Sequence, residues 1–203
     1  MKPNLEVKIG KIKMQNPVTV GSGTFGLQNG QFFDLSKLGA IVPKGITLKP
    51  KEGNPAPRMV ETASGMLNAI GLQNPGLEGF LEQLPAYERL DIPIIVNISG
   101  ESEKDYAKLA YELTKTGKIH GLEINVSCPN LKSGGMQFGA DPKATAKIVK
   151  AVKKETNLTV ITKLTPNVTN VTEIAKAAES AGSDAISLIN TLLGTSIDVK
   201  TRR

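Results

Sequence analysis

The sequence predicts an α/β fold built around a parallel β-sheet, and three observations point to it. Short runs of β-branched apolar residues alternate along the chain with segments whose apolar residues recur every three or four positions. The later runs are apolar almost throughout, as in strands that are covered on both faces. Repeated units of this kind give parallel strands joined by right-handed crossovers. The length of 203 residues suits a single domain.

The expected elements follow in order. Residues 5–14 alternate apolar and charged side chains around a turn at Gly10 and Lys11, which predicts a β-hairpin. The hairpin occupies residues 1–16, ahead of a main body over 17–203. Six strands are expected in that body, at residues 18–20, 40–42, 94–96, 122–126, 160–164 and 185–189.

Four helices are expected between these strands. Apolar residues share one face over 101–116, 141–154 and 172–181, and Asp141 followed by proline is a typical helix start. A further apolar stripe over 77–84 is expected to end at Pro85. Two long segments, 46–76 and 127–139, have no sustained period and follow strand ends, so we expect them to be functional loops.

Composition excludes several classes of protein. Cys128 is the only cysteine, so this chain forms no internal disulfide and no four-cysteine cluster. His120 is the only histidine, which excludes a multi-histidine metal site. No signal peptide or membrane-length apolar stretch is present, and we expect a cytoplasmic protein. The net charge of +6 comes from scattered residues without interleaved aromatics, which argues against nucleic-acid binding.

Polar residues stand at the end of every expected strand. Parallel strands bring their carboxyl ends to one edge, where ligands bind in α/β proteins. A single polar strand end needs no functional explanation, but six in a row favour one shared site. In chain order these residues are Ser22 between two glycines, Lys44, Asn97, Asn125 followed by Cys128, Lys163, and Asn190 with Thr191.

The residue types indicate the kind of ligand. Asparagine amides both donate and accept hydrogen bonds and suit a heterocycle with amide-like edges, while the two lysines would balance negative charge. No strand end carries Asp or Glu, which argues against a Mg²⁺ or Ca²⁺ site. A free cysteine is commonly a core residue. Cys128 lies between Ser127 and Pro129 in an expected loop, which favours a thiolate acting as a general base.

Two competing motifs carry less weight. Residues 21–26 fit the dinucleotide pattern G-x-G-x-x-G, but Gly30 would interrupt the helix that should follow, and Lys44 stands where an acid is needed. His120 precedes the fourth expected strand, at the end of the sheet away from the polar cluster. A structural role is expected for it, which also argues against a Ser-His-Asp hydrolase.

At these residues the chain resembles the catalytic flavin subunit of class 1B dihydroorotate dehydrogenases. The matching stretches run along essentially the whole chain in family order. They are VPKGIT around Lys44, SGMLNAIGLQNPG from Ser64, IVNISG around Asn97, EINVSCPN from Glu123, ITKLTPNV around Lys163, and LINTLLG from Leu188.

The resemblance implies a (β/α)8 TIM barrel of the FMN-dependent type, with about six of the eight strands present in this chain. It implies that Cys128 is the catalytic base, and it assigns two sets of ligand contacts. The FMN contacts would be Ser22, Lys44, Gly45, Asn97, Asn125, Lys163 and Ile189. The dihydroorotate contacts would be Lys44, Asn68, Ala69, Ile70, Gly71, Leu72, Asn125, Asn190 and Thr191.

The family's activity is oxidation of dihydroorotate to orotate in pyrimidine biosynthesis, with hydride transfer to FMN. The resemblance implies that electrons pass to NAD through a partner subunit that carries FAD and a [2Fe–2S] centre. It also implies a homodimer within a heterotetramer, without nucleic-acid or membrane partners. No metal site is expected in this chain.

Because six strands are found where the family has eight, we expect a C-terminally truncated chain without the loops that hold the cofactor phosphate. Two alternatives remain. One is another FMN barrel, such as a dihydrouridine synthase acting on tRNA. The other is a cofactor-free fragment without enzymatic activity.

Overall fold

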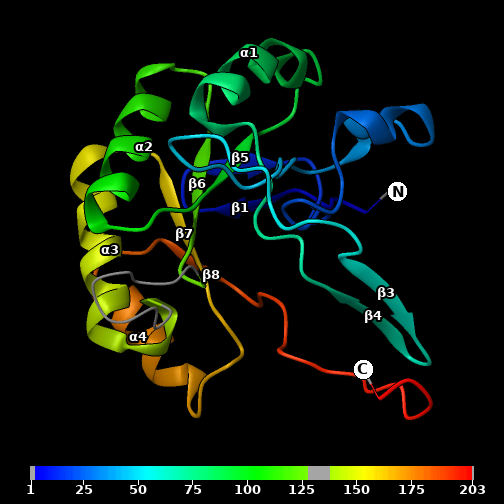
Figure 1. The fold of residues 1–203 in the computed structure, drawn as a ribbon. Helices are drawn as coiled ribbons and strands as arrows, with labels where there is room; N and C mark the ends of the chain where they lie inside the picture. Colours follow the sequence, from blue (N-terminus) through cyan, green and yellow to red (C-terminus); the bar gives the residue numbers. More distant parts are fainter. Residues whose placement is uncertain (1–2, 128–137, 203) are drawn as a thin grey trace.

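A four-stranded parallel sheet forms the centre of the molecule (Figure 1). The computed structural model describes residues 3–127 and 138–202. The strands are β5 (Ile95–Ile98), β6 (Gly121–Asn125), β7 (Thr159–Lys163) and β8 (Ala185–Ser187), and they pair in chain order. The α/β class with a parallel sheet is therefore confirmed, and four of the six expected strands lie in this sheet. Within the described residues the sheet does not close into a barrel.

Four helices cover one face of the sheet (Figure 1). Side-chain caps start three of them: Ser102 accepts a hydrogen bond from the Asp105 amide, Asp141 from the Lys143 amide, and Asn170 from the Thr172 amide. Such caps satisfy amides that would otherwise lack a partner at a helix start. The helices are α1 (Gly76–Glu88), α2 (Glu103–Lys115), α3 (Pro142–Glu155) and α4 (Val171–Ser180).

The main hydrophobic core lies between these helices and the sheet. Alternate strand residues such as Val96, Leu122 and Val160 point to the helices and are fully buried. Each aliphatic side chain buried in this way contributes about 1.5–3 kcal/mol. The core explains why the central strands are apolar on this face and free to carry polar residues on the other.

The other face of the sheet has an apolar lower layer, toward the amino ends of the strands. Strands β1 (Val7–Ile9) and β2 (Ile12–Met14) form the expected antiparallel hairpin, and Ile12 packs there with Ile95 and Ile161. The Lys11 amide donates a hydrogen bond of 2.8 Å to Thr159 Oγ1. The hairpin thus covers the lower end of this face and leaves the upper end to polar residues.

Two expected strands differ in the structure: the strand at residues 18–20 does not form, and the strand at residues 40–42 is reduced to a single bridge. Residues 18–20 form no strand: Val18 is 57% exposed, and its carbonyl accepts one hydrogen bond, from the Gly39 amide. Residues 40–42 run parallel to β5, but only Ile41 makes a ladder bridge there, to Ile94. Pro43 follows directly and has no amide hydrogen to continue the ladder. Pairing resumes at Ile46, which bridges Ile98.

Two further expectations need correction. The segment expected to be irregular contains a hairpin of β3 (Met59–Thr62) and β4 (Gly65–Asn68), which extends away from the sheet (Figure 1). Helix α1 does not end at Pro85 but continues to Glu88. The extra turn buries Tyr87 against Phe80, with ring centroids 6.1 Å apart. That burial offsets the backbone hydrogen bond that the proline cannot make.

The remaining elements are short. Among the described residues, the 3₁₀ helices are η1 (Leu27–Gln31), η2 (Leu35–Lys37) and η4 (Phe138–Ala140). Beyond β8, residues 188–202 contain no helix or strand, and Leu193 is 82% exposed there. In the ranges 3–127 and 138–202, no helix has the length and apolar character needed to cross a membrane.

Candidate active site

The carboxyl ends of the strands bring the predicted polar residues to one edge of the sheet. Asn97 lies on β5, Asn125 on β6 and Lys163 on β7, and the register places Asn125 directly opposite Lys163. Asn97 is 1% exposed and lies directly against Gly45. Any residue larger than glycine at position 45 would place its Cβ in collision with Asn97 Oδ1. These contacts place Gly45 beside β5, as a shared site requires.

Positive charge gathers beside this edge around Lys44. Burial lowers the pKa of Lys44, and the nearby charges of Arg58 and Lys163 lower it further. A Cβ added to Gly23 would lie 2.9 Å from Lys44 Nζ, so the glycine loop around Ser22 approaches the same cation. Three cations held this close create a strong preference for an anionic ligand. Arg58 was not among the predicted site residues, because it comes from the proline-rich segment that showed no periodic pattern.

Asn125 is held in place by groups from three elements. Its Oδ1 accepts hydrogen bonds from Asn190 Nδ2 at 2.9 Å and from the Ser127 amide at 3.0 Å. Its backbone carbonyl accepts a hydrogen bond of 2.6 Å from Tyr106 Oη on α2. Two of the predicted ligand contacts, Asn125 and Asn190, are therefore joined directly to each other.

A cavity of about 380 Å³ opens beside this pair. Ser127 also lines it, and among the described residues its buried hydroxyl has no hydrogen-bond partner. Such a group is suited to a polar ligand atom, because an unsatisfied buried hydroxyl costs free energy. Five of the predicted substrate contacts lie in the wall: Gly71, Leu72, Asn125, Asn190 and Thr191.

The comparison with known families agrees with this constellation. A model of the dihydroorotate dehydrogenase family matches residues 4–203. The chain belongs to the dihydroorotate dehydrogenase family. The motifs that gather at the strand ends are thus part of a match that covers nearly the whole chain.

Curated relatives in this family are similar along the same length. A "Dihydroorotate dehydrogenase B (NAD(+)), catalytic subunit" of Geotalea daltonii is 51% identical, over 100% of this chain and 67% of the relative. Proteins with the same name from Desulforamulus reducens and Thermoanaerobacter pseudethanolicus are 54% and 53% identical, over 68% and 67% of their lengths. The chain therefore spans about two thirds of the relatives it matches.

Lys44 and several other residues that the family resemblance assigns do not line the cavity. Asn68 and Ala69 are exposed at the end of β4, and Ile70 next to them is half-buried. Ile189 is 45% exposed just after β8. Cys128, the expected base, lies outside the described residues, so its role stays a prediction.

Glu123 and Asn167 were also not predicted as site residues, yet both touch predicted ones. Glu123 on β6 accepts a hydrogen bond from Asn97 Nδ2 at 2.6 Å. Its signal was visible: an acid inside an apolar strand, two positions before Asn125 and so on the same face. Asn167, after β7, lines the cavity and donates to the Thr191 carbonyl at 3.0 Å. Its sequence gave no signal beyond its place after a strand.

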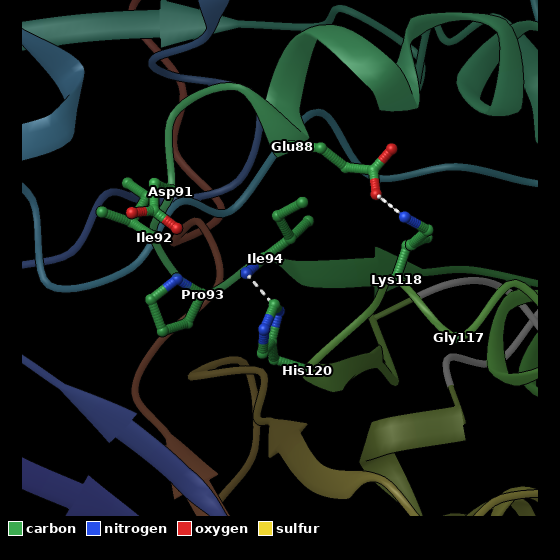
Figure 2. A pocket seen from close by; sticks show the side chains of 8 residues that line it. All are labelled: Glu88, Asp91, Ile92, Pro93, Ile94, Gly117, Lys118 and His120. Carbon is green, nitrogen blue, oxygen red and sulfur yellow. Dashed lines mark hydrogen bonds and ion pairs between the residues drawn. The ribbon is translucent and has the colours of Figure 1, made fainter.

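A second hollow, of about 300 Å³, lies at the amino ends of β5 and β6 (Figure 2). Polar groups there already pair with one another. Glu88 Oε1 and Lys118 Nζ are 2.7 Å apart, and the Ile94 amide donates to His120 Nδ1 at 3.1 Å. His120 therefore has a structural contact far from the strand-end cluster. In the described part of the chain, no three His, Cys, Asp or Glu residues gather as metal ligands would.

Proposed function

We propose that this chain is the catalytic part of a class 1B dihydroorotate dehydrogenase, which oxidises dihydroorotate to orotate in pyrimidine biosynthesis. One observation carries the proposal: in a chain 51% and 54% identical to two curated catalytic subunits, the residues of the family motifs lie at a polar, cationic edge of a parallel sheet. The whole protein would be a (β/α)8 TIM barrel of the FMN-dependent type, to which this chain contributes the hairpin and the strands described above.

The residues at the strand ends fit FMN. Between them, the amides of Asn97 and Asn125 offer an acceptor and a donor to the amide-like edge of a flavin, and Gly45 lies directly against Asn97. Lys163 supplies positive charge near the same edge. Ser22, Lys44 and Ile189 complete the proposed contacts. When bound, FMN would supply the hydride acceptor that no protein side chain can provide.

Dihydroorotate would occupy the neighbouring cavity. Its carboxylate would pair with Lys44, whose unfavourable charged state an anion would relieve. The amides of Asn125 and Asn190 would bind the ring of the substrate. The segment 68–72 and Thr191 would complete the contacts, since Gly71, Leu72 and Thr191 line the same cavity.

The proton chemistry would belong to Cys128. A Cys128 thiolate would remove the C5 proton of dihydroorotate as the hydride leaves C6, and the two losses together form the conjugated ring of orotate. A thiol serves here because its pKa can be brought near neutrality by nearby positive charge.

Electrons would leave through a second protein. One cysteine cannot hold a four-cysteine iron–sulfur cluster, so NAD⁺ reduction would need a partner subunit with FAD and a [2Fe–2S] centre. We propose that two copies of the catalytic subunit and two of the partner form a heterotetramer.

The test uses the purified full-length protein. It should bind FMN, and dihydroorotate should bleach the flavin absorbance under anaerobic conditions. Artificial acceptors should be reduced, whereas NAD⁺ should be reduced efficiently only after the partner subunit is added. Efficient reduction of fumarate would indicate the other class of the family. Failure to bind FMN or to respond to dihydroorotate would refute the proposal.

A further inference from the structure

Glu123 carries a buried carboxylate among the polar residues near the carboxyl ends of the strands. It is 8% exposed and lies on β6, where every other residue of the strand except Asn125 is apolar. Two donors from other strands reach it: Asn97 Nδ2 of β5 at 2.6 Å and Ser187 Oγ of β8 at 2.8 Å. The carboxylate thus links three of the four strands of the sheet.

The chemistry of these contacts fixes the direction of the Asn97 amide. A carboxylate only accepts hydrogen bonds, so the nitrogen of Asn97 must face Glu123. The oxygen of the same amide is therefore turned away, toward Gly45 and the strand-end site. Ser187 is constrained in the same way, because its proton is used on Glu123.

We infer that Glu123 is a positioning residue: it holds Asn97 with its Oδ1 directed at the cofactor site, so that the bound FMN meets a hydrogen-bond acceptor. The inference rests on the proposed function, since it needs FMN at the strand ends. Asn97 alone could turn by 180° and offer its NH₂ group instead. Glu123 removes that choice at the cost of burying a charged group, which its two donors partly offset.

The inference predicts the direction in which FMN affinity changes, and this direction is opposite to the one that a simple effect of charge would give. FMN carries a negative phosphate, so removing the negative charge of Glu123 should tighten FMN binding if charge were all that mattered. If Glu123 positions Asn97, the same change should weaken binding. Glu123→Met makes this change at similar size: the thioether is only a weak acceptor, so both Asn97 and Ser187 lose the partner that they donate to.

The experiment measures the FMN dissociation constant of the full-length protein by quenching of flavin fluorescence, together with the visible spectrum of the bound flavin. Glu123→Met should raise the dissociation constant about 10-fold or more, as expected from the loss of a hydrogen bond to a charged group, and should shift the flavin bands. Unchanged or tighter binding in Glu123→Met would overturn the inference.

Thr159→Val is a matched control for stability. Thr159 is 1% exposed on β7 and accepts a hydrogen bond from the Lys11 amide, in the apolar lower layer. This variant should lower the melting temperature and leave FMN affinity and spectrum unchanged. Equal weakening of FMN binding by Thr159→Val would reduce Glu123 to a residue that only stabilises the fold.

A second pair repeats the comparison if Glu123→Met does not fold. Glu123→Asp keeps acceptor oxygens for Asn97, whereas Glu123→Val, of similar size, keeps none. The Asp variant should bind FMN at least about 10-fold more tightly than the Val variant, and equal binding would overturn the inference. Absence of FMN binding by the unmodified protein would instead refute the proposed function, so the two failures are distinguishable.

Discussion

The side chain of Asn167 binds the backbone around Thr191, 24 residues further along the chain. Asn167 Nδ2 donates a hydrogen bond of 3.0 Å to the Thr191 carbonyl. Its Oδ1 accepts a hydrogen bond of 3.0 Å from the Leu193 amide. The loop after β7 therefore holds the chain after β8, where Asn190 and Thr191 line the cavity.

Asn167→Ala should weaken substrate binding more than it weakens the fold. It removes a hydrogen bond to Thr165 and the two hydrogen bonds to the segment 191–193, each worth about 0.5–1.5 kcal/mol. Because that segment is freed, KM for dihydroorotate should rise roughly 10-fold with a smaller change in kcat. Steady-state kinetics of the full-length protein measure both constants. Asn170→Ala is the control, because Asn170 caps α4 and makes no hydrogen bond to Thr191 or Leu193. It should lower the melting temperature and leave KM unchanged; a raised KM in both variants would contradict the assignment.

Lys44→Met should weaken binding of orotate about 10- to 100-fold, because a hydrogen bond between charged groups is lost. Titration of the flavin spectrum with orotate measures the effect. Lys49→Met changes an exposed lysine nearby and should bind orotate as the unmodified protein does. Equal affinity of Lys44→Met and the unmodified protein would remove Lys44 from the substrate site.

Lys44 should also change the pH dependence of stability. Because burial and neighbouring cations lower its pKa in the folded state, the unfolded chain binds more protons than the folded chain between that lowered value and 10.5. The free energy of unfolding due to Lys44 should thus rise with pH across this window and fall as pH falls through it. Melts of the ligand-free protein from pH 8 to 11 should show this rise relative to Lys44→Met, and parallel curves would contradict it.

Cys128→Ala should retain FMN and lose oxidation of dihydroorotate. A general base typically contributes about 10²- to 10⁴-fold, and kcat should fall by that factor. Cys128→Ser should keep slight activity that increases at high pH, since a hydroxyl is a far weaker acid than a thiol. Stopped-flow reduction of the flavin by dihydroorotate isolates this step. Full turnover by the alanine variant would assign the proton to another group.

His120 lies at the opposite end of the sheet from the site and should add a small pH dependence to the free energy of unfolding. Burial lowers its pKa below 6.5, and its Nδ1 must stay unprotonated to accept from the Ile94 amide. The unfolded chain then binds more protons just below pH 6.5, so stability falls as pH drops through the lowered value. The effect is small because part of the residue remains in contact with water. Urea unfolding at pH 5 and 7.5 should differ less in His120→Gln; an unchanged difference would contradict this role.

The elements that could be predicted are those whose signal lies in neighbouring residues, such as apolar alternation in a hairpin or a cap at a helix start. The hairpin at Val7–Ile9 and Ile12–Met14 follows from alternation around Gly10, and the helix starting at Pro142 follows from its cap. The hairpin that begins with Met59–Thr62 was not predicted, because its side chains are mostly exposed and so show no apolar alternation. Residues 18–20 look like a strand, yet the nearby chain offers them too few backbone partners.

The site was predictable where it depends on strand ends and unpredictable where it depends on loops. Asn97, Asn125 and Lys163 were found because parallel strands share an edge. Arg58 reaches Lys44 from the loop between residues 46 and 76, and no period in the sequence encodes that approach. Family resemblance supplied the role of Cys128, which composition alone left between a core residue and a base.

The docking of the β1–β2 hairpin on β7 imposes an order on folding. Its turn at Lys11 is anchored to Thr159, which lies 148 residues further along the chain. The two strands of the hairpin pair locally, but Ile12 is buried only when the hairpin packs on the sheet, where its partners include Ile95 and Ile161. Closing so long a loop costs entropy before any contact compensates for it. The hairpin is therefore among the first segments able to pair and among the last to dock, and Ile12 stays exposed to chaperones or to aggregation in the interval.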